Sequence, residues 1–442
     1  MLAASTVAYL ERTVPLSTSA LATAARLAAA HEHEDFVLYE NSGHWSFACG
    51  PLARLILDRH GARVQGAMSE ELAWGSEPLR DVQTLLDRLP VRGWRAYGWS
   101  AFELAYAKDG DAGAVGDQQL LHLMIPGAEV RFGPSVALVR ATEEAALQRL
   151  VELVEGTTPE TEAAATPLAV RERGREQYRQ SVANAIAEIN DGRVQKVICS
   201  RVVAVEHEID LVSTFVVGRR ANNPARSFLI RLGGVEVAGF SPEIVVQVTT
   251  DGKVTIQPLA GTRVVSPDAA ENQRLRAELL SDSKEIYEHA ISVQVACDDL
   301  RGVCVPESIV VEEFMAIRER GSVQHLASRV SGRLEDGRRA WDAFGAAFPA
   351  VTASGVPRSA AYQSIRRIEE SERGLYSGSV LTVDDEGAMD AALVLRSVYR
   401  QDGRTWLRAG AGIVGQSSPE REFEETCEKL DSVAQFLVPQ SA

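Results

Sequence analysis

The clearest hydrophobic patterns in the chain are two stripes with helical spacing, one past the middle and one near the end. The first stripe consists of Ile286, Ala290, Val293, Cys297 and Leu300. The second consists of Phe423, Cys427, Leu430, Ala434 and Leu437. Apolar residues that recur every three or four positions predict amphipathic helices. Ser418 and Pro419 are a typical N-cap and first helical residue, so the second helix is expected to begin there.

Alternating and β-branched runs predict strands between and before these helices. A helix containing Tyr178 and Ile189 is expected to end near Gly192, ahead of a β-branched strand at 194–205. Hairpins are expected at 228–239 and at 244–256, and further strands at 379–382, 391–399 and 405–408. Hairpins followed by helices favour an α+β fold with mainly antiparallel sheet over a doubly wound parallel fold.

A polar, low-aromatic connector at 155–162 separates a leading third of the chain from the rest. The leading third carries a predicted helix at 20–30 and a predicted strand at 36–39. The boundary is therefore expected near residue 165, with one region at 1–165 and another at 166–442.

Composition indicates a folded protein without nucleic acid or membrane partners. The chain has 442 residues, 45% of them hydrophobic, enough for a sizeable core. A net charge of −15 argues against nucleic acid and anionic membranes as partners. Five widely spaced cysteines form neither a disulfide framework nor a zinc motif, and no window approaches 18 apolar residues. A cytoplasmic protein is expected.

Each predicted amphipathic helix carries a pair of acidic residues three positions apart, Glu285 with Glu288 and Glu422 with Glu425. Two such faces brought together form an all-oxygen cage suited to a hard divalent cation. The alternative is that they are solvated surface acids. With 61 acidic residues in 442, about eight such pairs arise from composition alone, so spacing does not decide between the two.

Two motifs suggest sites that their context argues against. The segment 410–415 matches G-x-G-x-x-G after a predicted strand, but too little chain follows to complete a dinucleotide-binding unit. Its glycines are better suited to letting backbone amides approach a carboxylate. His31 to Glu34 lacks the spacing of a zinc helix and is interpreted as a solvated helix end.

Four motifs resemble those of the chorismate-utilising enzymes, the family of anthranilate, aminodeoxychorismate, isochorismate and salicylate synthases. They are Pro258-Leu259-Ala260-Gly261-Thr262-Arg263, Phe348-Pro349-Ala350-Val351-Thr352-Ala353-Ser354-Gly355-Val356-Pro357, Tyr376-Ser377-Gly378, and Gly410-Ala411-Gly412-Ile413-Val414 leading to Pro419-Glu420-Arg421-Glu422. The resemblance covers about residues 170–438 and implies one large α+β fold of two stacked, mainly antiparallel sheets surrounded by helices. It also implies that the N-terminal part, 1–165, packs onto the same fold, and that 166–442 is the catalytic region. The four glutamates are implied to bind Mg²⁺.

Single positions within these motifs indicate the type of reaction. Ala260 stands where some relatives have a lysine nucleophile, and Lys196 stands where water-using members have their general base. The resemblance therefore implies water as the nucleophile and no glutaminase subunit. The segments 348–355 and 375–380 are similar to those of salicylate synthases. This implies conversion of chorismate through isochorismate to salicylate and pyruvate, as in siderophore biosynthesis, by a monomer. The alternative is an isochorismate synthase that stops halfway.

The resemblance also assigns roles to individual residues. Lys196 would be the base, provided that burial and neighbouring cations favour its neutral form, and Glu243 the acid, kept protonated by its setting. Tyr376 and Arg396 would grip the enolpyruvyl carboxylate. His325 and Thr352 would line the site of pyruvate loss. Backbone amides at Gly261, Thr262, Gly410 and Gly412 would complete an anion cradle, and Lys429 would balance the acidic cluster. Ordinary structural roles for these residues are the alternative.

Overall fold

The computed structural model of the protein describes residues 6–157 and 163–440. The last five residues of the predicted connector, 158–162, lie outside the described residues. The elements before the connector are β1 (Leu10–Pro15), α1 (Ala20–Ala30), β2 (Phe36–Asn41), β3 (His44–Asp58), β4 (Gly61–Gly66), β5 (Glu70–Ala73), α2 (Pro78–Asp87), β6 (Arg95–Ser100), α3 (Leu104–Lys108), η1 (Ala112–Ala114), β7 (Leu121–Phe132), β8 (Val136–Ala141) and α4 (Glu144–Glu155).

The rest of the chain continues the alternation of hairpins and helices that the hydrophobic pattern predicts. Its elements are α5 (Arg175–Asn190), β9 (Lys196–Val205), α6 (Leu211–Ala221), β10 (Arg226–Leu232), β11 (Val235–Ser241), β12 (Ile244–Val248), β13 (Lys253–Ile256), β14 (Leu259–Val264), α7 (Ala269–Ser281), α8 (Ser283–Arg301), η2 (Pro306–Ser308), β15 (Val310–Arg320), β16 (Val323–Arg333), α9 (Ala340–Ala347), η3 (Val351–Ala353), β17 (Gly355–Val356), α10 (Arg358–Ile368), β18 (Ser379–Asp384), β19 (Met389–Leu393), β20 (Ser397–Gln401), β21 (Arg404–Ile413) and α11 (Pro419–Ala434).

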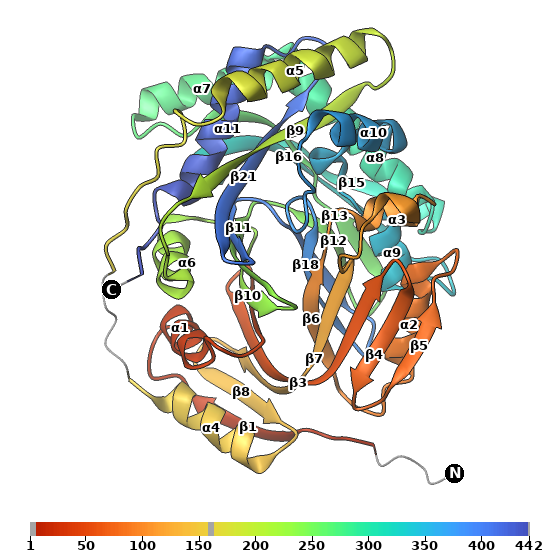
Figure 1. The fold of residues 1–442 in the computed structure, drawn as a ribbon, viewed down its shortest axis with the longest axis vertical. Helices are drawn as coiled ribbons and strands as arrows, with labels where there is room; N and C mark the ends of the chain where they lie inside the picture. Colours follow the sequence, from red (N-terminus) through yellow and green to blue (C-terminus); the bar gives the residue numbers. More distant parts are fainter. Residues whose placement is uncertain (1–5, 158–162, 441–442) are drawn as a thin grey trace.

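The expected α+β class with mainly antiparallel pairing is confirmed. Each pairing between these strands is antiparallel, and hydrogen bonds join the strands of the two expected layers into one connected system. Strands from both sides of the connector pair directly, β2 with β10 and β6 with β18. In Figure 1 the red and orange strands accordingly run beside green and blue ones.

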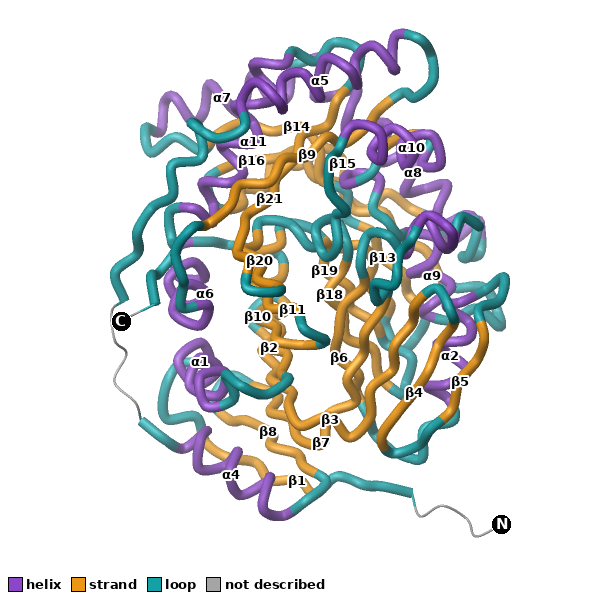
Figure 2. The backbone as a smooth tube through the Cα atoms, viewed as in Figure 1, coloured by secondary structure: helices purple, strands orange, loops and turns teal. Residues whose placement is uncertain are grey.

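Helices cover one end of this sheet system, where the two acidic pairs lie. α11 packs on β21 and on α5, while α8 packs on β14 and β16. Figure 2 shows these helices, in purple, around the strands β9, β14, β16 and β21 in the upper part of the view. The two glutamate helices therefore lie against strands of the same sheet system. Within 6–157 and 163–440, no helix combines the length and the apolar character that crossing a bilayer requires.

Several locally encoded elements are confirmed at or near their predicted bounds. α1, β12 and β13 begin and end at the predicted residues, and the hairpin of β10 and β11 turns at Gly233 and Gly234. Ser418 caps α11 by accepting a hydrogen bond from the Arg421 amide, and Pro419 is its first residue. Turn glycines and caps act through neighbouring atoms, which explains why the sequence alone places them.

Two strand predictions were wrong in extent. The strand predicted at 391–399 is two strands, β19 and β20, because Arg396 between them has a left-handed backbone with φ of 50°. β21 does not stop at residue 408 but continues to Ile413, so Gly410 and Gly412 lie inside a paired strand.

The buried face of α8 also differs from the prediction. Ala290 of the predicted apolar stripe is exposed, and Ile286 is only half-buried. Val293 and Leu300 of the stripe are buried as predicted, but the buried face also contains Glu285, Glu288 and Ser292. The prediction therefore holds for the later turns of α8, while acidic side chains are buried in its first turns. At the end of α1, His31 is likewise buried rather than solvated, with Nδ1 bonded to the Leu27 carbonyl.

Candidate active site

Two glutamate pairs meet between α8 and α11, far from bulk water. The exposed fractions of the four residues are 3% for Glu285, 6% for Glu288, 1% for Glu422 and 4% for Glu425. The alternative that they are solvated surface acids is therefore wrong. Buried carboxylates are costly unless a cation compensates them, so their partners determine what the cluster can do.

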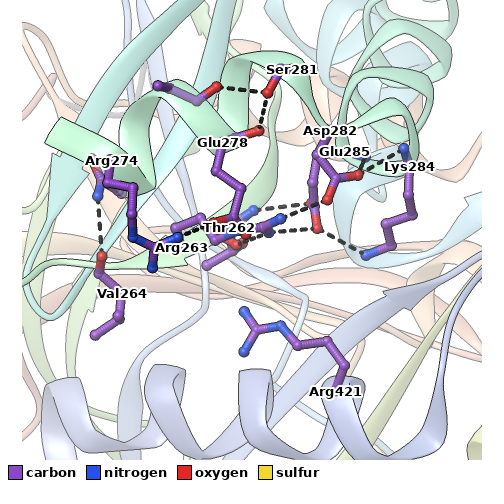
Figure 3. Close-up of polar contacts among 12 residues, drawn as sticks. Thr262, Arg263, Val264, Arg274, Glu278, Ser281, Asp282, Lys284, Glu285 and Arg421 are labelled. Atoms are coloured by element: carbon purple, nitrogen blue, oxygen red, sulfur yellow. Dashed lines mark hydrogen bonds and ion pairs between the residues drawn. The ribbon is translucent and has the colours of Figure 1, made fainter. Parts of the chain in front are cut away.

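Four basic side chains supply that compensation. Lys196 Nζ lies 3.0 Å from Glu288 Oε1, Lys429 Nζ lies 2.7 Å from Glu425 Oε1, and Arg263 Nη1 lies 2.9 Å from Glu285 Oε1. Lys284 Nζ lies 3.3 to 3.5 Å from Glu422, Glu288 and Glu285. Figure 3 shows Lys284, Arg263 and Glu285 converging at the start of α8. Four carboxylates thus face four cations.

The cluster holds its carboxylates in different protonation states. Burial alone would raise the pKa of Glu425, but the neighbouring Lys429 and Lys284 lower it to about 2. Burial, with Glu425 close by, raises the pKa of Glu422 to about 7. Glu422 Oε2 is buried and has no hydrogen-bond partner among the described residues. Glu422 therefore lacks a full complement of partners.

The donor set fits a hard divalent cation such as Mg²⁺. Carboxylate oxygens are its preferred ligands, and α8 and α11 each supply two buried carboxylates, one of which has an oxygen without a hydrogen-bond partner. In the part of the chain that the structure describes, however, no three acidic, histidine or cysteine side chains already converge as they do around a bound ion. Binding would require the side chains to rearrange. The four residues as Mg²⁺ ligands remain a prediction.

A pocket opens beside the glutamate cluster and brings most of the predicted site residues together. Those lining it are Glu243, Gly261, Thr262, Glu288, His325, Thr352, Tyr376, Arg396, Gly410, Gly412, Glu425 and Lys429. The remaining three, Lys196, Glu285 and Glu422, lie in the adjoining cluster. The predicted residues that line the pocket come from β14, β16, β21, α8, α11 and four other segments. The pocket therefore exists only once the whole fold has formed.

Lys196 lies at the first residue of β9 and is fully buried. Besides its contact with Glu288, its Nζ donates a hydrogen bond to Ser292 Oγ at 3.1 Å. Gly412, on the neighbouring β21, makes this arrangement possible. A Cβ atom at Gly412 would lie 2.1 Å from Glu288 Oε1 and 3.2 Å from Lys196 Cε. Only glycine leaves room for the pair.

Glu243 lies between β11 and β12 with its side chain in the pocket. Thr352 Oγ1 donates a hydrogen bond to Glu243 Oε1 at 2.6 Å. Burial raises the pKa of Glu243 to about 8, although the bond from Thr352 opposes this shift. The carboxyl is therefore mostly protonated at neutral pH and is able to donate a proton, as predicted for an acid. Thr352 contacts the predicted acid directly.

Arg396 and His325 form a contact that sequence motifs did not reveal. Arg396 Nη2 lies 2.5 Å from His325 Nε2, and His325 Nδ1 lies 3.1 Å from Thr262 Oγ1. Burial and the Arg396 charge hold the pKa of His325 well below its usual value, so the ring is neutral. Because a guanidinium only donates, Nε2 accepts and Nδ1 carries the proton. His325 thus orients Arg396, whose pKa burial lowers to about 9.

The backbone around Gly261 serves the glutamates as well as the pocket. Gly261 has φ of 81° at an irregularity in the pairing of β14 with β16, a conformation that favours glycine. The next amide, that of Thr262, donates to Glu285 Oε2 at 3.2 Å. At the other wall, Lys429 Nζ donates to the Gly410 carbonyl at 3.0 Å. The Thr262 amide of the predicted anion cradle therefore already holds a carboxylate.

Sequence reasoning missed two cations of the site. Arg408 lines the pocket, lies 5.3 Å from the ring centroid of Tyr376, and pairs with the buried Glu369. The sequence contained a signal for Arg408. Arg408, Gly410 and Gly412 are spaced two residues apart along β21, which places all three on one face of the strand. Lys284 directly precedes Glu285, but nothing in the local pattern indicates that it reaches α11.

Comparison with known proteins identifies related sequences. The sequence model described as chorismate binding enzyme matches residues 34–435, further into the leading third than the motifs extended. A salicylate synthase of Mycolicibacterium paratuberculosis is 42% identical over 417 residues, covering 92% of this chain and 90% of its own.

Solved structures share the fold at lower identity. Anthranilate synthase component I of Streptococcus pneumoniae superposes with a TM-score of 0.74 at 23% identity, covering 90% of this chain and 92% of its own. The menaquinone-specific isochorismate synthase of Escherichia coli superposes with a TM-score of 0.74 at 20% identity, covering 98% and 96%. The shared architecture extends over nearly the whole chain.

Proposed function

The chain belongs to the chorismate-binding enzyme family, and from that premise we propose that it is a Mg²⁺-dependent salicylate synthase. It would convert chorismate to isochorismate by adding water, and isochorismate to salicylate and pyruvate. The observation that carries this proposal is a pocket lined by Glu243, whose buried carboxyl has its pKa raised to about 8, beside a cluster in which buried Lys196 contacts Glu288.

The first step needs a base, an acid and neutralisation of a dianionic substrate. Lys196 would take a proton from the water that attacks C2, and Glu243 would give its proton to the hydroxyl that leaves C4. A C2–O bond forms to the attacking water as the C4–O bond breaks, and the hydroxyl leaves as water after it receives the proton of Glu243. Lys196 acts as a base only when Glu288 has another cation as partner, because the two are in contact at 3.0 Å.

Mg²⁺ would be held by Glu288 and Glu425, with Glu285 and Glu422 binding directly or through water, and when bound it would neutralise the ring carboxylate. Arg396 and Tyr376 would hold the enolpyruvyl carboxylate, and Lys429 would balance Glu425. With water as nucleophile, no ammonia-supplying glutaminase subunit is required.

The second step is governed by shape. The C2 hydrogen passes to the methylene carbon of the enolpyruvyl group, the C3–O bond breaks, and the ring becomes aromatic as pyruvate leaves. This requires the side chain to be folded over the ring. Arg396, oriented by His325, would fix the carboxylate end of that conformation.

Incubation of the pure protein with chorismate and Mg²⁺ tests the proposal. We expect pyruvate and fluorescent salicylate in equal amounts, with no second enzyme. Isochorismate accumulating without pyruvate would identify an isochorismate synthase instead, and unchanged chorismate would reject both activities.

A Lys196→Gln variant separates the two steps. It should lose about 10²–10⁴-fold in chorismate consumption, the usual contribution of a positioned base, yet still release pyruvate from supplied isochorismate. Normal consumption of chorismate by this variant would place water activation elsewhere.

A further inference from the structure

Lys284 bridges the two glutamate helices α8 and α11. Its Nζ lies 3.4 Å from Glu288 on its own helix and 3.3 Å from Glu422 on α11. It also lies 3.5 Å from Glu285. In Figure 3 the side chain extends from the start of α8 toward Glu285, beside the space above Arg421. One ammonium therefore contacts carboxylates from both pairs.

This position is unfavourable for a lysine on local grounds. Asp282 is the N-cap of α8, so Lys284 lies in the first turn, where the helix dipole disfavours a positive charge. A lysine four residues before a glutamate is also the weaker orientation of such a pair. The side chain is only 14% exposed. The carboxylates across the helix interface, rather than its own helix, must hold it there.

The partners of the basic side chains lead to the same residue. Lys196, Lys284, Lys429 and Arg263 already lie beside the four buried glutamates, so a dication that enters the cluster meets positive charge in place. Lys196, Lys429 and Arg263 are each fixed by additional oxygen partners, namely Ser292 Oγ, the Gly410 carbonyl and the Thr262 carbonyl. The described partners of Lys284 Nζ are carboxylates alone. Lys284 is thus the cation most readily displaced.

We propose that Lys284 is an internal counter-ion that occupies the cation position between α8 and α11 and moves aside when the divalent metal binds. The inference rests on the proposed function, which requires Mg²⁺ at these glutamates. It explains why the described carboxylates do not yet converge as around an ion. Lys284 compensates the negative charge of the metal-free cluster and thereby weakens metal binding to a level that permits exchange.

Metal binding without chorismate tests this inference. Mn²⁺, detected by electron paramagnetic resonance, is titrated into the full-length protein and into Lys284→Met. We expect the variant to bind Mn²⁺ about tenfold or more tightly, because the competing charge is gone while every carboxylate remains. Lys253→Met is the matched control, since it removes the same charge from an exposed pair with Glu312. It should bind as wild type does.

Thermal unfolding provides a second measurement. In EDTA, Lys284→Met should melt below wild type, because four buried carboxylates have lost a counter-ion, and added Mg²⁺ should raise its Tm more than it raises that of wild type. If Lys284→Met does not fold, Lys284→Gln, which keeps hydrogen bonding, replaces it in both experiments. Equal or weaker Mn²⁺ binding by the neutral variant, or no Mn²⁺ binding by either protein, would overturn the inference.

These measurements remain separate from the proposed function. They use no chorismate, so the identity of the product does not affect them. A wild-type enzyme that failed to consume chorismate would reject the proposed function, while a tighter Mn²⁺ complex in the variant would still support the role of Lys284.

Discussion

At the residue scale, burial decides the protonation state of the predicted acid. Glu243 is buried, which raises the pKa of its carboxyl to about 8. The acid form is the one that donates a proton, so activity should persist through neutral pH and fall as pH rises past about 8. Thr352 favours the ionised form, because a hydrogen bond to a carboxylate stabilises its charge.

Replacing Thr352 with valine tests this balance. Without the hydroxyl, the pKa of Glu243 should rise further, and the alkaline fall in kcat should move to higher pH. The readout is the pH at which kcat falls on the alkaline side, measured from pH 6 to about 10. The absolute value of kcat does not enter this comparison. Ser354→Ala is the control, since Ser354 donates to the Ala350 carbonyl in the same segment. An alkaline limb that stays in place in Thr352→Val would contradict the assignment of Glu243.

At the element scale, β21 both pairs with β9 and lines the pocket. Arg408, Gly410 and Gly412 point to one face, and all three line the pocket. Glycine inside a strand weakens pairing but allows close approach, here of Lys196 and Glu288. Glycines therefore occupy positions of β21 where a larger residue would pair more stably but would leave no space for the side chains of the site.

Gly412→Ala should cost activity while leaving the fold intact. The new methyl group would collide with the ends of the Glu288 and Lys196 side chains, which are able to shift, rather than with backbone. Misplacing reacting groups by about 1 Å lowers turnover about 10²-fold, so we expect a loss of at least this size in kcat/KM.

Gly415→Ala provides the comparison, because its Cβ would lie 3.7 Å from Asn190 and 3.9 Å from Ile189, an ordinary contact distance. Both variants are measured for kcat/KM and for Tm. Near wild-type activity in Gly412→Ala would show that the close approach is dispensable.

At the scale of the whole molecule, strands from both sides of the connector complete each other's sheet. β2 pairs with β10 along its length, and β6 pairs with β18 along its length. We propose that the regions 1–165 and 166–442 form one folding unit. The leading third would then support the site without supplying its predicted catalytic residues.

A chain truncated to residues 166–442 should therefore lose cooperative folding. β10 and β18 would present unpaired edges, and the buried side chains of Phe228 and Leu381 would lose neighbours. We expect a broad thermal transition and binding of a hydrophobic dye, measured beside the full-length chain. A sharp transition and chorismate turnover by the truncated chain would show that the region folds alone.

The sequence by itself determined the local elements and the family. Hairpin turns at Gly233-Gly234 and Asp251-Gly252, the Ser418 cap and the apolar face of α11 depend on atoms within a few residues of each other. The family motifs likewise lie in short segments, so the resemblance identified half of the residues that line the pocket before their arrangement was known.

Only the tertiary structure decided which groups meet. The buried acidic face of α8, the left-handed break at Arg396 and the contact of Arg396 with His325 arise between segments distant in the chain. Lys284 is the clearest example, because its local pattern predicts a solvated first-turn lysine, while Glu422 of α11 holds it inside. Short-range periodicity encodes the faces of an element, but the charges that oppose a buried side chain are known only when the elements have packed.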